Sequence, residues 1–249
     1  MWREDITPYK IFISEVMLQQ TQTARVIPKF INWMQKFPDF QTLAAASQHE
    51  VLSAWQGLGY NRRGLAVHAS AKKIVQNFFS KLPCDPKLLQ TLPGIGPNTA
   101  GSICVFVFNL PVVFIETNIR TVFLHEFFPE QLDIDDQQLL PLIAQSLDHQ
   151  NPRDWYYALM DYGVYLKKEL KVSNKNSKHY TRQSKFIGSR RQVRGAIIRI
   201  LTKLHKVSND ELLELVTQEL PNNQHDVLKI INQLLVEKFI KKNQNQLFL

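Results

Sequence analysis

Apolar residues up to about Lys171 recur at spacings of three and four, the period of amphipathic helices, with little of the alternation that marks strands. The pattern predicts a helix starting near Pro8 and further helices over residues 23–36, 48–55, 62–79, 86–90, 98–108, 118–127, 137–148 and 154–169. The breaks between them fall at proline and glycine, at positions 38, 57–59, 83, 93–97, 111 and 152. We therefore predict an all-α domain of many short helices over residues 1–171.

The pattern changes after residue 171. Residues 172–189 are rich in Asn, Ser, Lys and Thr, and we predict a basic linker there. Residues 190–249 return to helical spacing, which predicts helices near 191–204 and 224–238. Capping-box spacing at residues 208–211 predicts a further helix that starts there. Two terminal runs around residues 243–245 suit a hairpin. Three helices and a hairpin make a winged helix-turn-helix, a domain suited to DNA that also mediates protein contacts.

Composition is that of an ordinary soluble globular protein of one or two domains, with 249 residues of which 44% are hydrophobic and 21% charged. The sequence has no long apolar span and no apolar segment at its start, so we expect an intracellular, cytoplasmic protein that is monomeric and does not contact a membrane. Cys84 and Cys104 are too few for a disulfide framework or a Cys-ligated metal cluster. We expect no metal site and no cofactor.

Net charge is +8 and the sequence pI is about 9.4, which favours a polyanionic partner. Between Tyr162 and Asn209 the only acidic residue is Glu169. A solvated basic face is one interpretation of such a run. Its length and its interleaved aromatic residues favour contacts with phosphates. The run contains Lys167, Lys168, Lys171, Lys175, Lys178, Arg182, Lys185, Arg190, Arg191, Arg194, Arg199, Lys203 and Lys206.

Glu15 stands in an apolar setting within residues 12–21. If this run is helical, the neighbours three and four residues away are mostly apolar, so the carboxyl should be partly desolvated. Desolvation raises the pKa of a carboxyl, which a general acid working near neutral pH requires. The alternative is an ordinary solvated glutamate on a helix.

The sequence Leu-Pro-Gly-Ile-Gly at residues 92–96 lies between two predicted helices. Its glycines permit a tight turn that leaves backbone N–H groups exposed at the start of the next helix, an arrangement suited to a phosphate. A purely structural turn is the alternative. The position between helices favours a helix-hairpin-helix over a nucleotide-binding loop, which would follow a strand.

Glu116 ends an apolar run and stands at the start of a predicted helix. We expect the helix dipole and free N–H groups to lower its pKa, although a plain capping role would look the same. Together, Glu15 and Glu116 give two carboxyls whose pKa values are pushed apart, as for an acid paired with a permanent anion. Such a pair suits cleavage of a glycosidic bond.

Residues 2–171 resemble the helix-hairpin-helix superfamily of DNA base-excision glycosylases, and specifically its adenine glycosylase branch. The resemblance rests on the motifs Trp-Arg at 2–3, Pro-Tyr-Lys at 8–10, Ser-Glu-Val-Met-Leu-Gln-Gln-Thr-Gln at 14–22, Gly-Leu-Gly-Tyr at 57–60 and Leu-Pro-Gly-Ile-Gly at 92–96. It implies that Glu15 protonates the leaving base and that Gly94 and Gly96 grip phosphate. It also implies that Leu18, Gln19 and Tyr60 probe or wedge into the base stack.

The sequence departs from that family in four places. Glu116-Thr117-Asn118 replaces an Asp-Gly-Asn context, and Asn98 replaces the lysine that forms a Schiff base in bifunctional lyases, so monofunctional hydrolysis is favoured. The four cysteines around an iron–sulfur cluster are missing, and the basic segment 175–185 is expected to compensate. The predicted winged helix stands in place of the usual C-terminal module related to Nudix hydrolases.

The sequence thus predicts a monofunctional glycosylase acting on a flipped base in double-stranded DNA, most simply adenine opposite 8-oxoguanine or guanine. A thymine or uracil mismatch glycosylase of the same fold is an alternative, and a non-catalytic DNA-binding or regulatory protein is another. The expected catalytic residues are Glu15 and Glu116. The expected DNA contacts are Leu18, Gln19, Gln20, Tyr60, Gly94, Gly96, Asn98, Asn118, Lys178, Arg182 and Lys185.

Overall fold

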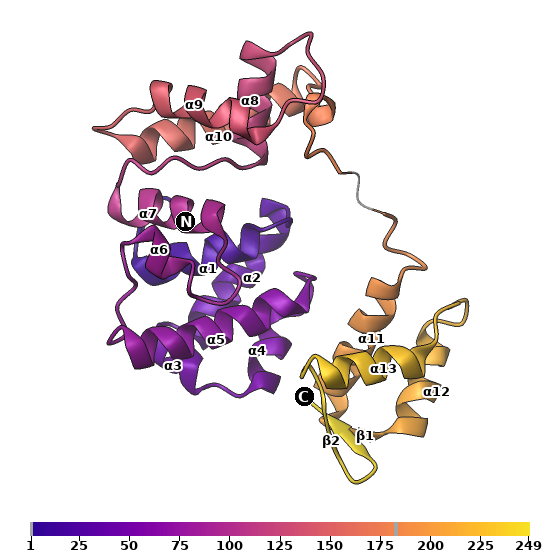
Figure 1. Cartoon of the computed structure of the whole chain (residues 1–249). Coiled ribbons are helices and arrows are strands. Elements are labelled where there is room, and N and C mark those ends of the chain that lie inside the picture. The colour runs from indigo at the N-terminus through magenta and orange to yellow at the C-terminus, as the bar shows by residue number, and fades with distance from the viewer. Residues whose placement is uncertain (1, 182–183) are drawn as a thin grey trace. The chain divides into compact units, whose positions relative to one another are not determined.

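The computed structural model describes residues 2–181 and 184–249 (Figure 1). The chain divides into two compact units. The described parts of the first unit are residues 2–19 and 76–181, and those of the second unit are residues 20–75 and 184–249. Within the described residues, no helix is long and apolar enough to cross a membrane.

Helices dominate both units, as the hydrophobic pattern predicts. The first unit contains α1 (Pro8–Leu18), α6 (Pro86–Leu89), α7 (Pro97–Phe108), α8 (Thr117–Phe127), α9 (Asp136–Ser146), α10 (Pro152–Lys168) and the 3₁₀ turn η1 (Asn174–Asn176). The second unit contains α2 (Thr23–Lys36), α3 (Phe40–Ala45), α4 (Gln48–Trp55), α5 (Asn61–Asn77, ending just past the division), α11 (Arg190–Leu204), α12 (Asn209–Glu219) and α13 (Val227–Val236). It also holds the strands β1 (Lys206–Ser208), β2 (Lys241–Asn243) and β3 (Gln246–Phe248).

Local capping explains where many helices begin. Thr7 caps α1 by accepting a hydrogen bond from the backbone N–H of Lys10, and Pro8 occupies the first turn. Ser47 and Glu50 form a complete capping box at α4, and the observed bounds of α2 and α4 are the predicted ones. Helix α3 was not predicted, because its six residues are too few to show a helical period.

The core of the first unit forms where α10 packs against α7 and α8, and α8 against α9, around buried residues such as Phe114, Ile119 and Tyr156. Gly163 on α10 permits the close approach of α8, because a Cβ there would lie 2.4 Å from the carbonyl oxygen of Asn118. The same contact fixes α10 beside the N-terminus of α8. The packing therefore positions the segment that carries Glu116.

Residues 206–249 of the second unit include a three-stranded antiparallel sheet in the order β1-β3-β2. Helices α11, α12 and α13 belong to the same unit, so the three helices and the terminal hairpin that the sequence predicts are present (Figure 1). The strand β1 was not predicted, because three residues are too short to show alternation. Helix α11 packs on α4, and Leu52 of α4 belongs to the same buried cluster as Leu201 and Ile231.

Residues 172–181 of the predicted linker are attached to the first unit. Asn174 in η1 accepts a hydrogen bond from the Thr121 hydroxyl at 2.7 Å and donates one to the Thr117 carbonyl at 3.1 Å. Ser177 forms an isolated parallel bridge with Ile134. Over this stretch Asn174 bonds to α8 within the first unit.

Candidate active site and nucleic-acid interface

Glu15 lies on α1, in the part of the helix that packs against α7. Its carboxylate oxygen Oε2 accepts a hydrogen bond of 2.6 Å from the hydroxyl of Ser102, a buried residue of α7. The side chain keeps some solvent exposure, so a ligand has access to it. The packing of α1 on α7 thus gives the Glu15 carboxyl one specific donor.

Burial raises the pKa of Glu15 from 4.5 to about 7. The negative charge of Glu116 contributes in the same direction, whereas the Ser102 hydrogen bond and the charge of Arg3 lower the pKa. The predicted upward shift is confirmed. At neutral pH this carboxyl exists in both protonated and ionised forms, which is the condition a general acid needs.

Glu116 is the N-cap residue of α8 and accepts hydrogen bonds from the backbone N–H groups of Asn118 at 2.8 Å and Ile119 at 3.2 Å. The predicted cap is therefore present. The predicted fall in its pKa is wrong, because burial of the carboxyl raises the pKa and outweighs these two bonds. Sequence reasoning counted the donors at the helix terminus but not the protein atoms that exclude water.

A polar chain runs from Glu116 through Asn118 to Lys167 on α10. The Asn118 amide nitrogen lies 3.4 Å from Glu116 Oε2, and the Lys167 ammonium donates to Asn118 Oδ1 at 2.7 Å. Burial lowers the pKa of Lys167, and the charge of Glu116 raises it. The nearby cation also favours the ionised form of Glu116. Asn118, expected to contact DNA, thus links the candidate anion to a partly buried lysine.

The glycine hairpin joins α6 to α7 as predicted. Gly94 has a φ of +79°, a left-handed conformation that favours glycine, and Gly96 is the N-cap of α7 with open space where a Cβ would be. Both glycines are exposed. The Gln19 amide donates to the Gly94 carbonyl at 3.3 Å and to Thr99 Oγ1 at 3.1 Å, so α1 holds the hairpin.

Asn98, in the first turn of α7, accepts a hydrogen bond of 3.3 Å from the backbone N–H of Ile115. This bond joins the hairpin helix to the residue before Glu116. The first unit contains Glu15 and Glu116 together with the expected DNA contacts Leu18, Gln19, Gly94, Gly96, Asn98 and Asn118.

Ser102, Arg3, Tyr157 and Lys167 surround the two carboxyls and were not predicted as site residues. Arg3 bonds to both carboxylate oxygens of Asp161, at 2.9 and 3.0 Å, and its guanidinium lies 4.4 Å from the centre of the Tyr157 ring. The Trp-Arg motif contained a signal for Arg3. The other three lie 51 to 142 residues from the carboxyls they influence, where no short motif marks them.

The expected DNA contacts Gln20, Tyr60 and Lys185 lie in the second unit. Gln20 and Tyr60 both have positive φ, at 53° and 47°, and Tyr60 is 43% exposed. Arg63 supports this loop by donating to the carbonyls of Leu58 and Gly59 at 3.1 and 3.3 Å. Burial lowers the pKa of Arg63 to about 10. The Arg63 guanidinium also lies 5.5 Å from the centre of the Tyr60 ring.

The basic run is partly neutralised within the chain. Arg194 forms an ion pair with Glu237 at 2.6 Å, and Arg199 pairs with Glu219. In the linker, Lys178 pairs with Asp135 at 3.3 Å, Lys185 is exposed, and Arg182 lies outside the described residues. Charge density along the sequence therefore overstates the number of cations available to phosphates.

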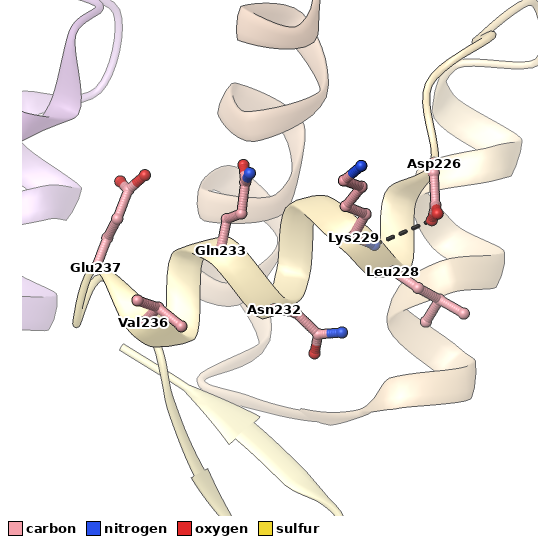
Figure 2. A pocket seen from close by; sticks show the side chains of 7 residues that line it. All are labelled: Asp226, Leu228, Lys229, Asn232, Gln233, Val236 and Glu237. Carbon is pink, nitrogen blue, oxygen red and sulfur yellow. Dashed lines mark hydrogen bonds between the residues drawn. The ribbon is translucent and has the colours of Figure 1, made fainter.

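An open groove of about 500 Å³ follows the outer face of α13. Figure 2 shows Lys229, Gln233 and Glu237 along one row of the helix and Leu228, Asn232 and Val236 along another. The groove lies in the second unit, whereas Glu15 and Glu116 lie in the first.

The cysteines do not fit an iron–sulfur cluster. The sequence has two, and such clusters take four cysteine ligands. Cys104 is buried, its thiol donates to the carbonyl of Cys84 at 3.2 Å, and burial raises its pKa to about 11, which disfavours the thiolate that binds iron. Among the described residues, no group of three or more His, Cys, Asp or Glu could hold a metal ion.

The class of protein follows from sequence comparison with known families. Residues 13–222 match the HhH-GPD superfamily base excision DNA repair protein family, and the chain belongs to this family. It is similar to the adenine DNA glycosylase of Homo sapiens, with 37% identity over 64% of this chain and 30% of that protein. Similarity to the adenine DNA glycosylase of Buchnera aphidicola is 33% over 66% of this chain and 47% of that protein. The chain thus spans less than half the length of these curated relatives.

Solved structures share the fold. A thermostable thymine-DNA glycosylase superposes with a TM-score of 0.60 at 20% identity, covering 69% of this chain and 80% of that one. A non-covalent endonuclease III–DNA complex gives a TM-score of 0.59 at 17% identity, covering 66% of this chain and 77% of that one. The helix-hairpin-helix glycosylase fold predicted from the motifs is confirmed.

Proposed function

We propose that the chain is a monofunctional DNA glycosylase that hydrolyses the N-glycosidic bond of adenine mispaired with 8-oxoguanine or guanine. The observation that carries the proposal is Glu15, whose desolvated carboxyl has a pKa of about 7 and a hydrogen bond to Ser102, in the same unit as Glu116. The similarity to curated adenine DNA glycosylases supports adenine as the base.

Glu15 acts as the general acid. Its protonated form delivers a proton to a ring nitrogen of the flipped base, which turns the base into a better leaving group. The Ser102 hydroxyl fixes the orientation of the carboxyl. Its hydrogen bond also stabilises the negative charge that Glu15 carries after it has given up its proton.

Glu116 acts as the anion opposite the sugar cation that forms as the base departs. Two backbone N–H groups and the Lys167–Asn118 pair favour its ionised form, against the burial that disfavours it. A buried anion of this kind stabilises developing positive charge more strongly than a solvated one. Water then attacks the anomeric carbon, and Glu15 is reprotonated from solvent.

Asn98 supports hydrolysis over lyase chemistry. An amide at this position cannot form a Schiff base with the sugar, and its oxygen is occupied by the Ile115 N–H. The protein would therefore leave an abasic site and an intact strand. We propose that it works without an iron–sulfur cluster, on duplex DNA, as a monomer in the cytoplasm.

The test is single-turnover excision from duplexes that each carry one mismatch or lesion, with and without alkali after the reaction. We expect strand breaks only after alkali, and the fastest release from adenine opposite 8-oxoguanine or guanine. Release of thymine or uracil instead would assign the chain to pyrimidine mismatches. Binding without release of any base would make it a DNA-binding protein, and breaks before alkali would show a lyase.

A further inference from the structure

The turn at residues 57–60 presents the side chain of Tyr60 at the surface of the second unit. Gly57, Gly59 and Tyr60 all have a left-handed φ, at 89°, 72° and 47°, and Leu58 between the glycines is buried. A residue other than glycine rarely adopts this conformation, so the contacts around Tyr60 must hold it there. An aromatic ring that is exposed and held in this way is suited to stacking on a nucleic-acid base, whose flat face is available whatever the base.

Two arginines from distant parts of the sequence contact Tyr60. The guanidinium of Arg63, in the first turn of α5, lies 5.5 Å from the centre of the ring. Arg191, in the first turn of α11, donates from Nη1 to the Tyr60 hydroxyl at 3.5 Å. Both contacts lie within the second unit. A residue of the C-terminal helices thus restrains a side chain that lies 131 residues earlier in the chain.

The guanidinium of Arg191 is itself fixed by the segment that precedes α11. Its Nη2 donates to the Ser184 carbonyl at 2.7 Å, to the Ser184 hydroxyl at 3.1 Å and to the Lys185 carbonyl at 3.5 Å. Because a guanidinium is rigid and planar, the bonds of Nη2 set the direction in which Nη1 points. These bonds favour a role in positioning Tyr60 over a role as a contact to phosphate.

Helix α11 is held against the elements on either side of the turn. Arg62, two residues after Tyr60, forms an ion pair with Glu237 at 3.2 Å, and Glu237 also pairs with Arg194 of α11 at 2.6 Å. Leu52 of α4, before the turn, belongs to the buried cluster that α11 to α13 form. The packing of residues 190–249 on α4 and α5 therefore keeps α11 beside the turn.

We propose that Arg191 is a positioning residue for Tyr60, and that it holds the ring in the orientation in which the ring stacks on a base of bound DNA. This inference rests on the part of the proposed function in which the chain binds duplex DNA. A side chain that is ordered before binding loses less entropy when it inserts among bases. The C-terminal helices would therefore contribute to DNA binding through Tyr60, in addition to any contact with phosphates.

The test measures the affinity of the full chain for a duplex carrying a tetrahydrofuran abasic analogue, by fluorescence anisotropy over a range of salt concentrations. This duplex has no base to excise at the analogue, so affinity is measured separately from catalysis. Arg191→Met removes the donor, and Tyr60→Phe removes the hydroxyl that accepts but keeps the ring. We expect each to weaken binding about fivefold, the cost of ordering one side chain, and the double variant to lose no more than either single one.

Arg190→Met is the matched control. It removes one positive charge from the same turn of α11, but the bond that it breaks goes to Gln233 of α13. Its effect on affinity should therefore be the same with and without the Tyr60 hydroxyl. The slope of log affinity against log salt should be equal for Arg191→Met and Arg190→Met. A general loss of stability in Arg191→Met would add to the effect of Tyr60→Phe, so the double variant separates positioning from folding.

The inference and the proposed function fail in different ways. Additive losses for Arg191→Met and Tyr60→Phe, or a salt slope about one unit lower for Arg191→Met than for the control, would overturn the positioning role. Unchanged affinity in Tyr60→Ala would overturn it too, because the ring would then not stack on DNA. A protein that binds the duplex but releases no base from any mismatch would overturn the glycosylase proposal alone.

Discussion

The two candidate catalytic carboxyls of the first unit are largely surrounded by protein atoms, whereas part of the second unit presents exposed aromatic and basic side chains to solvent. Glu15 and Glu116 have raised pKa values because protein atoms surround them. Tyr60 is exposed, and so are Lys241 and Lys242 of β2, in the terminal hairpin that forms the wing. Desolvation makes a carboxyl reactive near neutral pH, and exposure lets a cation replace the counterions of DNA. Catalysis thus depends on buried groups, whereas these contacts with DNA depend on exposed ones. Substitutions should therefore change the excision rate and the affinity for DNA separately.

Glu15→Gln should have the largest effect on the first unit's chemistry. The amide is nearly isosteric and can keep contact with Ser102, but it cannot supply a proton. We expect single-turnover excision to fall about 100- to 10,000-fold with DNA affinity unchanged. A rate within a few fold of that of the unaltered protein would remove Glu15 from the role of acid.

Glu116→Gln should reduce excision about 100- to 1,000-fold, because a neutral amide does not stabilise the sugar cation. Glu116→Asp should keep part of the activity, since the charge remains but stands about one methylene further back. The comparison is made by single-turnover kinetics at saturating protein. Equal rates for all three versions would reduce Glu116 to a helix cap.

The pH dependence of excision tests the desolvation of Glu15 directly. A raised pKa means that the protonated acid is present below about pH 7 and is lost as pH rises through that value. The rate should therefore fall about tenfold per pH unit above 7. Ser102→Ala removes a bond that lowers the Glu15 pKa, so this variant should shift the fall in rate to higher pH. A profile that is flat from pH 6 to 9 would contradict the assignment.

Lys167→Met should slow excision by about tenfold, less than loss of Glu116 itself. The substitution keeps an apolar stem but removes the cation that bonds Asn118 and favours ionised Glu116. Without it the pKa of Glu116 should rise, so the rate should decline at the acidic end of the pH profile. An unchanged acidic limb would mean that the Lys167–Asn118 pair is only structural.

The smallest expected effect is on the affinity of the second unit for DNA. Replacing Lys241 and Lys242 together by Ala should reduce the slope of log affinity against log salt by about two units if the wing contacts two phosphates. Excision at saturating protein should not change. Lys72→Ala, at an exposed position of α5 in the same unit, is the control. If the slope of log affinity against log salt does not change, Lys241 and Lys242 do not contact phosphates. A protein partner would then be favoured for this part of the chain.

Removing residues 189–249 should weaken duplex binding and reduce its salt dependence, but it also disturbs the fold. Helix α11 packs on α4, and Leu52 is part of the core that α11 to α13 form. The deletion would therefore expose apolar surface in the second unit. Point substitutions in the wing avoid this and are the sharper test of DNA contact.

Much of the fold was predictable because local rules determine it. The period of apolar residues, the caps at Thr7 and Ser47, and the prolines between segments place most helices within two residues of their observed bounds. Glu15 was also predictable, because its apolar neighbours are adjacent along one helix face. Short elements such as α3 and β1 were not, since a period needs several repeats to be visible.

The sequence by itself determined the helical fold, the glycine hairpin and the identity of the two carboxyls. Only the tertiary structure decided their chemistry. Ser102, 87 residues from Glu15, reaches it through the packing of α1 on α7, and burial of Glu116 reverses the pKa shift expected from its helix terminus. The physical reason is that desolvation and hydrogen bonding act through space. A local pattern records the neighbours along one helix, but not the atoms that another part of the chain brings against it.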